Sequence, residues 1–250
     1  MRPIITLLTD FGTADGYVGE MKAVLLTRTP DATLVDITHE IPPQDIEAAR
    51  LTLARVWRRF PPGTVHLVVV DPGVGTERAA LAVSSDERFL VGPDNGVLSP
   101  ALLFAGARAV VLEVPSAAAP SFHGRDVFAP AAASLALGAE LRLLGQPSTA
   151  PRIRRTAEPQ RTEDGGLSGE VISIDRFGNA VTNLVGLRGG VVEVAGLSLS
   201  LRRTYGEVPP GTPIAIVGSS GLIEIAVRDG RAAQRLQLAR GSTVIFRGNA

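Results

Sequence analysis

Short apolar runs and longer segments with helical spacing alternate along the first half of the chain. The runs show no polar alternation, which is typical of strands buried on both faces of a sheet. The longer segments repeat apolar residues at helical spacing, which predicts helices. Strands are expected at 3–9, 33–37, 64–70, 79–83, 89–91 and 109–114, and helices at 15–28, 44–60, 98–105 and 127–137. This order predicts an α/β domain with a mostly parallel, doubly wound sheet.

The pattern changes near Gly145. Residues 148–164 are polar, contain proline and have no period, which is typical of a linker. Short apolar runs then recur between turn residues, at 169–174, 190–194, 197–201, 213–217, 222–227 and 242–246. This spacing predicts a smaller all-β domain, either a barrel or a sandwich. We therefore expect an α/β domain at 1–147 and a β domain at 165–250.

Composition and charge narrow the class of protein. The 25 acidic residues balance the 25 basic ones, so no net charge attracts nucleic acid or an acidic membrane surface. The absence of cysteine excludes disulfides and thiolate chemistry, and His39, His66 and His123 lack metal-ligand spacing. No signal peptide is evident and no apolar run approaches the roughly 18 residues of a membrane span. We expect a cytoplasmic protein that contacts neither nucleic acid nor membrane.

Acidic residues follow three of the expected strands. Asp10 lies in T-D-F-G, Asp71 in D-P-G-V-G-T and Asp94 in P-D-N-G. Ligands bind at the carboxyl ends of strands in open α/β sheets, although a single acid there often only braces a turn. Three such acids indicate a shared site that suits hydroxyl groups or a cation. The phosphate-binding patterns of nucleoside triphosphatases and dehydrogenases do not occur.

Seven motifs in both predicted domains carry a specific resemblance. The motifs are L-L-T-D-F-G at 7–12, D-I-T-H-E-I-P-P at 36–43, V-D-P-G-V-G-T-E-R at 70–78, G-P-D-N-G at 92–96, F-H-G-R-D-V-F-A-P at 122–130, I-D-R-F-G-N at 174–179 and S-S-G-L-I-E-I-A-V at 219–227. In this order they resemble the S-adenosyl-L-methionine (SAM) hydroxide adenosyltransferases, or SAM hydrolases, which are related to the SAM-dependent fluorinase and chlorinase. The resemblance implies hydrolysis of SAM to adenosine and methionine, by attack of water or hydroxide at the ribose 5′ carbon.

The resemblance also implies the chemistry and the roles of three residues. SAM is the substrate, and neither a cofactor nor a metal is implied, because the thioether leaves as a neutral group. Asp71, Arg78 and His123 match the water-activating group. Asp71 would accept a hydrogen bond from the water, Arg78 would favour deprotonated water and hold Asp71 ionised, and His123 would relay the proton.

Substrate contacts are implied in both predicted domains. Asp10 matches the acid that binds the two ribose hydroxyls, a bidentate task suited to a carboxylate. The positions implied around the methionine part are Asp15, Tyr17, Asp175, Ser219 and Ser220, and those around adenine are Phe177, Asn179, Tyr205 and the backbone near Ala232. Before Ala232 the sequence departs from the asparagine-rich turn of the family pattern, because it contains Arg228-Asp229-Gly230-Arg231.

Two other functions stay open. A protein that binds SAM or adenosine without turnover would keep the pocket but would not require Asp71, Arg78 and His123 together. A SAM-dependent halogenase is disfavoured, because the halogenases resemble one another in an aromatic residue, a serine and a tryptophan where this chain has Asp71, Gly124 and Gln44. The family resemblance further implies a homotrimer that holds SAM between the first domain of one subunit and the second domain of its neighbour.

Overall fold

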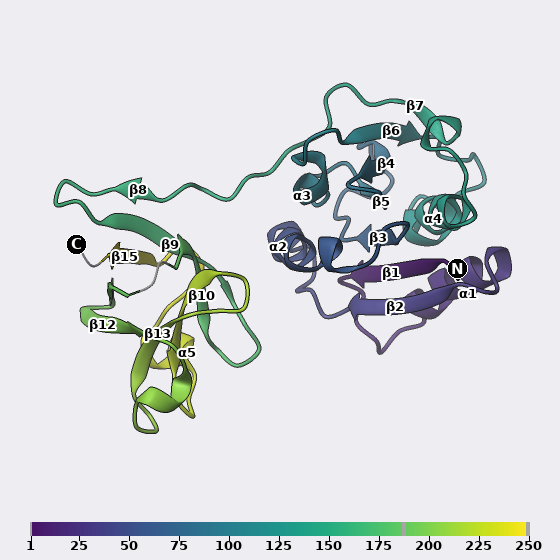
Figure 1. The fold of residues 1–250 in the computed structure, drawn as a ribbon. Coiled ribbons are helices and arrows are strands. Elements are labelled where there is room, and N and C mark those ends of the chain that lie inside the picture. The colour runs from purple at the N-terminus through teal and green to yellow at the C-terminus, as the bar shows by residue number, and fades with distance from the viewer. Residues whose placement is uncertain (1, 187–188, 249–250) are drawn as a thin grey trace. The chain divides into compact units, whose positions relative to one another are not determined.

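The computed structural model describes residues 2–186 and 189–248 (Figure 1). The chain divides into two compact units, Met1–Arg155 and Thr156–Ala250. The first unit is α/β and the second consists mainly of β-strands, in agreement with the two classes of domain that the sequence predicts.

The first unit is built around one sheet. Among residues 2–155 its seven strands follow the order β2-β1-β3-β5-β4-β6-β7. The strands are β1 (Ile4–Thr9), β2 (Thr33–Thr38), β3 (Val65–Val69), β4 (Ala80–Ser85), β5 (Arg88–Pro93), β6 (Arg108–Leu112) and β7 (Gly145–Pro147). The helices are α1 (Tyr17–Arg28), α2 (Ile46–Val56), α3 (Ser99–Leu102) and α4 (Ala129–Ala136), with 3-10 turns at Trp57–Arg59 and Leu141–Leu143 and a π-turn at Gly124–Phe128.

The prediction of a mostly parallel sheet holds for only part of this unit. Strands β2, β1, β3 and β5 pair in parallel, whereas β4 pairs antiparallel with both β5 and β6, and β6 with β7. Asp86 and Glu87 join β4 to β5 as a two-residue turn and both have positive φ. Such a turn reverses the chain at once, so it permits only an antiparallel pair.

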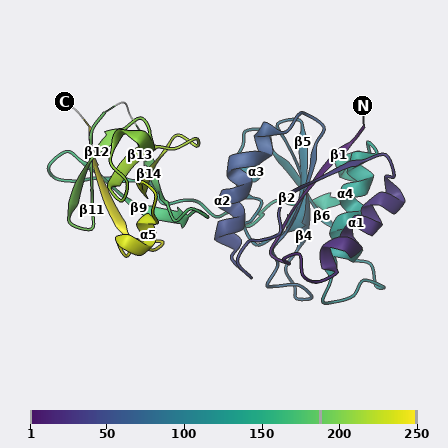
Figure 2. The same ribbon diagram turned by 90° about the horizontal axis from the view of Figure 1, so that it is seen from below.

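Helices cover both faces of this sheet, as expected for a doubly wound arrangement. Figure 2 shows α2 and α3 on one face and α1 and α4 on the other. Neighbouring residues of β1 supply the two cores, because successive side chains of a strand point to opposite faces. Leu7 packs in the cluster that contains Met21 and Phe128, and Leu8 packs with Leu53 and Trp57.

The second unit contains a closed barrel, one of the two architectures predicted for it. Among residues 156–186 and 189–248 the strands follow the order β10-β14-β13-β12-β11-β15-β9-β8, and β9 also pairs with β10. That last pairing closes seven strands into a ring and leaves β8 outside it. The elements are β8 (Gln160–Arg161), β9 (Leu167–Ile174), β10 (Ala180–Val185), β11 (Val191–Val194), β12 (Leu197–Arg202), β13 (Pro213–Val217), β14 (Leu222–Val227), α5 (Ala232–Arg235) and β15 (Thr243–Arg247).

Strand β10 is an element that the hydrophobic pattern does not predict. It contains Thr182 and Asn183, two polar residues that interrupt the apolar run, and both are buried. The Thr182 hydroxyl donates to the carbonyl of Ile223, and the Asn183 amide donates to the carbonyl of Ala157. These bonds satisfy the polar groups inside the unit, so their burial is tolerated.

No helix within the described residues is both long and apolar enough to cross a membrane.

The buried His66 makes the stability of the first unit depend on pH. Burial lowers the pKa of His66 to about 4, and Arg88 contributes to this shift. Between pH 6.5 and 4 His66 is therefore protonated in the unfolded chain but not in the folded chain. We expect the free energy of unfolding to fall by about 3 kcal/mol through His66 as pH drops across this interval.

Urea denaturation of the wild type and of His66→Leu at a series of pH values measures this effect. The unfolding free energy of the wild type minus that of His66→Leu should decrease as pH falls from 6.5 toward 4, because only the wild type carries the histidine. A difference that stays constant over this interval would contradict the prediction.

Candidate active site

Asp71, Arg78 and His123 form a buried cluster in the first unit. Arg78 Nε donates to Asp71 Oδ1 at 2.9 Å, and Arg78 Nη2 donates to Asp71 Oδ2. The same Nη2 lies 3.0 Å from His123 Nδ1. The exposed fractions of the Asp71 and Arg78 side chains are 5% and 6%, and His123 is 6% exposed. The structure thus brings together the three residues implied to activate water.

A tight turn after β3 carries Asp71 and Arg78. The amide of Val74 donates to the carbonyl of Asp71, and the amide and hydroxyl of Thr76 both donate to the carbonyl of Gly73. These bonds fold the chain back, so that Arg78 reaches the carboxylate seven positions before it. Asn95, from the loop after β5, donates to the carbonyl of Val70 at 2.8 Å and braces the end of the strand.

His123 lies immediately before the π-turn Gly124–Phe128, an uncommon element that often occurs at functional sites. Because a guanidinium can only donate hydrogen bonds, Nδ1 of His123 is the unprotonated acceptor of the Arg78 contact. Burial lowers the pKa of His123, and the charge of Arg78 lowers it further, while Asp71 and Asp126 oppose the shift. The ring is therefore neutral at pH 7 and carries its proton on Nε2.

One donor of the cluster has no hydrogen-bond partner in the part of the chain that the structure describes. Arg78 Nη1 is buried, and neither Asp71 nor His123 accepts from it. The guanidinium also lies 5.2 Å from the centre of the Phe128 ring. An unpaired buried donor is costly, so this atom is suited to hold an oxygen of a bound molecule.

Gly75 brings the Asp71 turn against the loop that carries His123. It has φ +75°, and a Cβ atom at this position would lie 2.5 Å from the carbonyl oxygen of Pro120. We expect Gly75→Ala to destabilise the protein by about 1–3 kcal/mol and to separate Asp71 from His123. Thermal unfolding measures the loss of stability, and the rate of SAM hydrolysis, the activity implied by the sequence motifs, measures the separation of Asp71 from His123.

Gly63→Ala is the matched control for this substitution. Gly63 has φ +83°, but no atom lies within 4 Å of the Cβ that would be added. The control introduces the same backbone strain without the clash, so it should lower stability by less and leave the reaction rate unchanged. Equal effects of the two substitutions would contradict a specific role for the contact between Gly75 and Pro120.

The other predicted residues of the first unit surround the ends of β1 and α1. Asp10 directly follows β1, and its Oδ2 accepts a hydrogen bond from the backbone amide of Gln44 at 2.7 Å. Asp15 is exposed. Tyr17 is half-exposed and packs edge-to-face on Phe122, the neighbour of His123.

Asp10 and the Asp71 turn leave neighbouring strands at the same edge of the sheet, because Thr9 of β1 is paired with Val69 of β3.

Asp94, the third acid predicted at this edge, has a bracing role. Its Oδ1 accepts the backbone amide of Arg152 at 2.7 Å, and its own amide donates to the carbonyl of Ala79. These bonds attach the chain near residue 152 to the end of β5. The structure thus supports the turn-bracing interpretation for Asp94.

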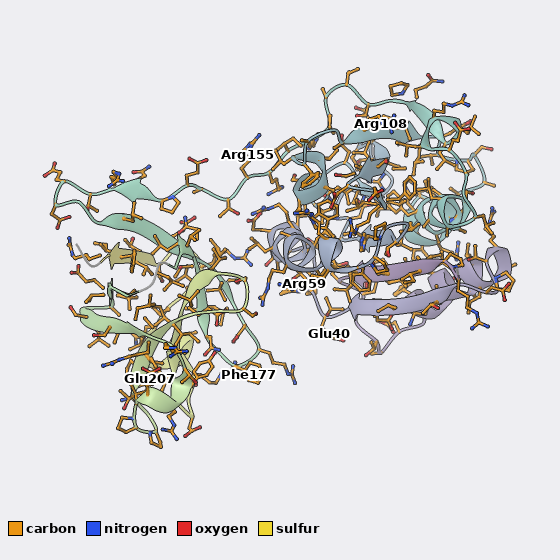
Figure 3. All side chains as sticks on the ribbon, in the orientation of Figure 1. Glu40, Arg59, Arg108, Arg155, Phe177 and Glu207 are labelled. Carbon is orange, nitrogen blue, oxygen red and sulfur yellow. The ribbon has the colours of Figure 1, made fainter. Side chains whose placement is uncertain are left out.

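Several predicted residues of the second unit share one turn, between β9 and β10. Asp175 accepts the backbone amide of Asn179 at 2.8 Å and its side-chain amide at 2.9 Å. Asn179 is buried, whereas Phe177 is 74% exposed at the tip of the turn (Figure 3). Ala232 is fully buried at the start of α5, and the amide of the next residue donates to the carbonyl of Gly178. This places the backbone near Ala232 beside the turn.

Tyr205 and the serine turn complete the predicted set. Burial raises the pKa of Tyr205, and the charges of Glu224 and Asp175 raise it further. Ser219 is exposed, and the hydroxyl of Ser220 is buried without a hydrogen-bond partner within the described residues. Glu224 is a buried acid that the sequence reasoning misses. Its signal is a charged residue in the middle of the apolar run 222–227.

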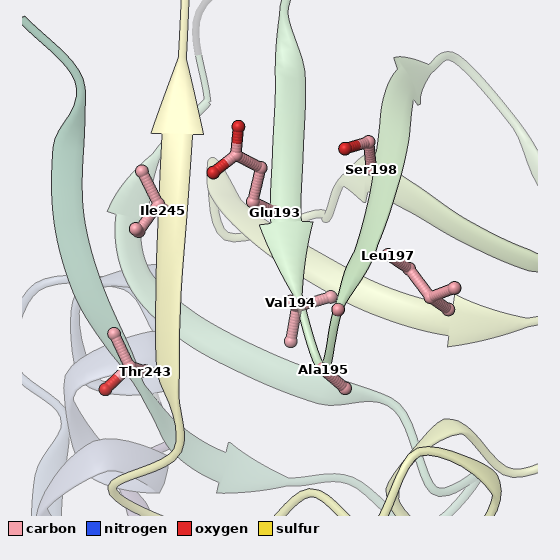
Figure 4. A pocket seen from close by; sticks show the side chains of 8 residues that line it. Glu193, Val194, Ala195, Leu197, Ser198, Thr243 and Ile245 are labelled. Carbon is pink, nitrogen blue, oxygen red and sulfur yellow. The ribbon is translucent and has the colours of Figure 1, made fainter. Parts of the chain in front are cut away.

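Two surface hollows lie away from the predicted residues. One, of about 330 Å³, lies at the β11–β12 hairpin and is lined by Glu193, Leu197 and Thr243, among others (Figure 4). The other, of about 550 Å³, is lined by residues such as Phe89, Arg108 and Leu141. Neither contains a residue of the Asp71 or Asp175 groups. Within the described residues no group of three or more histidines and acids is arranged to hold a metal ion.

The fold and the site together define a class of two-domain proteins, in which an α/β unit carries a buried Asp–Arg–His cluster and a β-barrel follows. Models of the N-terminal and C-terminal domains of SAM hydroxide adenosyltransferases match residues 5–145 and 169–245. The chain belongs to the SAM hydroxide adenosyltransferase family, as the sequence motifs predict.

Known relatives match nearly the full length of this chain. A Thermus thermophilus protein named (R)-S-adenosyl-L-methionine hydrolase is 46% identical, over 98% of this chain and 99% of the relative. A fluorinase of Actinopolyspora mzabensis is more distant, at 29% identity over 97% of this chain and 96% of its own. The crystal structure of an uncharacterized conserved protein from Thermotoga maritima superposes with a TM-score of 0.88, at 34% identity, and covers 97% of this chain and 99% of that one.

Proposed function

We propose that the protein hydrolyses SAM to adenosine and L-methionine. The buried Asp71–Arg78–His123 cluster carries the proposal, since it lies in a chain that is 46% identical to a named (R)-SAM hydrolase over nearly its whole length. In the reaction an oxygen of water forms a bond to the ribose 5′ carbon. The bond from this carbon to sulfur breaks, its electron pair stays on sulfur, and the water loses one proton.

The cluster orients and activates the water. Both oxygens of Asp71 accept from Arg78, and each keeps a lone pair that can accept a hydrogen bond from water. The unpaired Nη1 of Arg78 donates to the water oxygen, which favours the hydroxide form. The water proton moves to the free lone pair of an Asp71 oxygen, and His123 relays it onward: Nδ1 accepts a proton when its contact with Arg78 opens, and Nε2 releases the proton that it carries. The thioether leaves as a neutral group, so the reaction requires neither a general acid nor a metal ion, and SAM is the substrate of an enzyme without a cofactor.

The predicted substrate contacts follow from the same proposal. Asp10 binds the two ribose hydroxyls with the lone pairs that the Gln44 amide leaves free. Asp175 pairs with the methionine ammonium, and Ser219 and Ser220 bind its carboxylate. The remaining contacts with the methionine part are Asp15 and Tyr17, and those with adenine are Phe177, Asn179, Tyr205 and the backbone at Ala232.

The proposed assembly is a homotrimer of chains, each with an α/β domain at 1–147, a linker at 148–164 and a β domain at 165–250. The first domain supplies the water-activating residues and the ribose acid, and the second supplies most contacts with adenine and methionine. We propose that SAM is held between the first domain of one subunit and the second domain of its neighbour, and that the protein acts in the cytoplasm. Size-exclusion chromatography with light scattering tests the trimer.

Incubation of the purified protein with SAM in water enriched in heavy oxygen tests the reaction. We expect adenosine and methionine in equal amounts, with the label in the 5′ hydroxyl of adenosine. Label absent from that position would exclude attack of water at the 5′ carbon. Binding of SAM without formation of adenosine would instead identify a non-catalytic binding protein, and 5′-halogenated adenosine formed in the presence of halide would identify a halogenase.

A further inference from the structure

A buried histidine holds the turn that carries Asp10. His39 follows β2 and is 5% exposed. Its Nδ1 lies 2.8 Å from the hydroxyl of Thr9, and its carbonyl accepts the amide of Gly12 at 2.8 Å. Thr9 directly precedes Asp10, and Gly12 follows two positions after it. His39 therefore forms hydrogen bonds with the chain on both sides of Asp10, one through its ring and one through its backbone carbonyl, although it is distant from Asp10 in sequence.

The far side of the His39 ring is held by an ion pair. Nε2 of His39 lies 3.1 Å from Asp36 Oδ1, a close contact without the geometry of a hydrogen bond, and Lys22 Nζ donates to Asp36 Oδ2 at 2.6 Å. Burial opposes ionisation of Asp36, but the nearby Lys22 and His39 hold its pKa below the usual value. The ionised Asp36 can only accept, so the ring proton lies on Nε2 and Nδ1 is an acceptor.

With this tautomer the donors at Phe11, Thr9 and His39 all point toward Asp36. The Thr9 hydroxyl donates to Nδ1 of His39, and its oxygen accepts the amide of Phe11 at 3.3 Å. A chain of polar contacts thus runs from Lys22 through Asp36, His39 and Thr9 to the backbone amide of Phe11, next to Asp10. The Thr9 hydroxyl is bonded on both sides, and the His39 ring is bonded at Nδ1 and lies against Asp36 at Nε2, which restricts its orientation.

The carboxylate of Asp10 is held independently, at a cost in backbone strain. Gln44, whose amide donates to Asp10 Oδ2, has φ +66°, a conformation that non-glycine residues rarely adopt. Such strain persists only where the surroundings determine the backbone, and it is concentrated at functional positions. The turn and the carboxylate of Asp10 are therefore both fixed before any ligand binds.

We propose that His39 is a positioning residue for Asp10, which it orients through Thr9 and Gly12 for the two hydroxyls of the substrate ribose. The inference rests on the proposed role of Asp10 in ribose binding. A carboxylate fixed in this way loses little freedom when the ribose binds, and this preorganisation is how His39 contributes to affinity.

The chain offers a matched control on the same strand. Thr6, three positions before Thr9 in β1, pairs with the buried His66, and Thr6 Oγ1 lies 2.7 Å from His66 Nδ1. The two threonine–histidine pairs have the same chemistry and similar burial. The pair of Thr6 and His66 lies within the sheet, away from Asp10. A purely structural role would make the two pairs equivalent in their effect on ligands.

The experiment compares binding of adenosine and 2′,3′-dideoxyadenosine to the full chain, by calorimetry. His39→Gln keeps a polar group near Nε2 but loses the contact with Thr9. We expect it to weaken adenosine about tenfold, which is about 1.4 kcal/mol, and to leave dideoxyadenosine unchanged. In His39→Asn the side-chain amide takes the place of Nδ1, so this variant should bind adenosine nearly as tightly as the wild type. His66→Gln should lower the melting temperature and leave the preference for adenosine intact.

The outcomes separate this inference from the proposed function. An unchanged preference in His39→Gln, or equal weakening of the two nucleosides, would overturn the positioning role. So would an equal loss of preference in His66→Gln. A wild-type protein that binds the two nucleosides equally would instead overturn the ribose-binding role of Asp10, and the positioning role with it.

Discussion

Asp71→Asn should lower the rate of adenosine formation about 10²- to 10⁴-fold, the range expected when a positioned proton acceptor is lost. The amide has the size of the carboxylate but no negative charge, so it holds the attacking water weakly and does not favour its deprotonation. It also leaves the Arg78 guanidinium without its ionic partner. Steady-state measurement of adenosine release at saturating SAM gives the change in kcat.

Asp86→Asn is the matched control for this substitution. Asp86 is also paired with arginines, since its Oδ2 accepts from Arg58 at 2.8 Å and from Arg88 at 3.0 Å. It lies in the β4–β5 turn with φ +46°, a conformation that asparagine also adopts readily. The control should keep the wild-type rate. An Asp71→Asn enzyme that keeps most of its activity would overturn the proposed role of Asp71.

Arg78→Met should lower the free energy of unfolding by about 3–5 kcal/mol, because it leaves a buried carboxylate without its partner. The side chains of Arg78 and Asp71 are nearly inaccessible to water, so solvent cannot replace the lost hydrogen bonds. Adenosine formation should also be lost. Urea denaturation at neutral pH measures the stability change.

A second substitution distinguishes this explanation from a simple packing defect. The double variant Arg78→Met, Asp71→Leu removes both charges, so it should recover most of the lost stability while remaining inactive. Arg142→Met, which breaks an exposed pair with Glu140, should change stability little. A double variant as unstable as Arg78→Met alone would show that the buried charge is not the cause.

The hydrophobic pattern predicts the order of the main elements but not the direction of every strand. Buried runs and helical spacing are local properties, so they locate β1, α1, β2, α2 and β3 within a few residues. Strand direction after β3 depends on the two-residue turn at Asp86 and Glu87, which lacks the glycine or asparagine that usually marks such turns. The pattern does not predict β10 because Thr182 and Asn183 interrupt its apolar run, and the carbonyls that pair with them belong to β14 and to the segment before β8.

The site could be predicted to a different extent for each residue. Asp71 is visible as an acid at the end of a strand, and Arg78 lies in the same motif. His123 lies 45 positions away from Arg78, so only the family resemblance joins it to them.

The roles of His39 and Gln44 depend on a buried ring and on a positive φ, which no local pattern reveals. Asp94 has the same sequence signal as Asp71 but braces the chain, because its oxygen meets the Arg152 amide.

The strands at the ends of the two sheets also affect how the protein behaves at high concentration. Strand β7 has three residues and ends in Pro147, which has no amide hydrogen, and β8, outside the barrel, has two residues. Both are too short to act as a template for another chain. Among the described residues this leaves β2 as the one long edge, and the ion pair of Asp36 with Lys22 places charged groups near its centre. The fold therefore limits aggregation through strand addition at each of its edges.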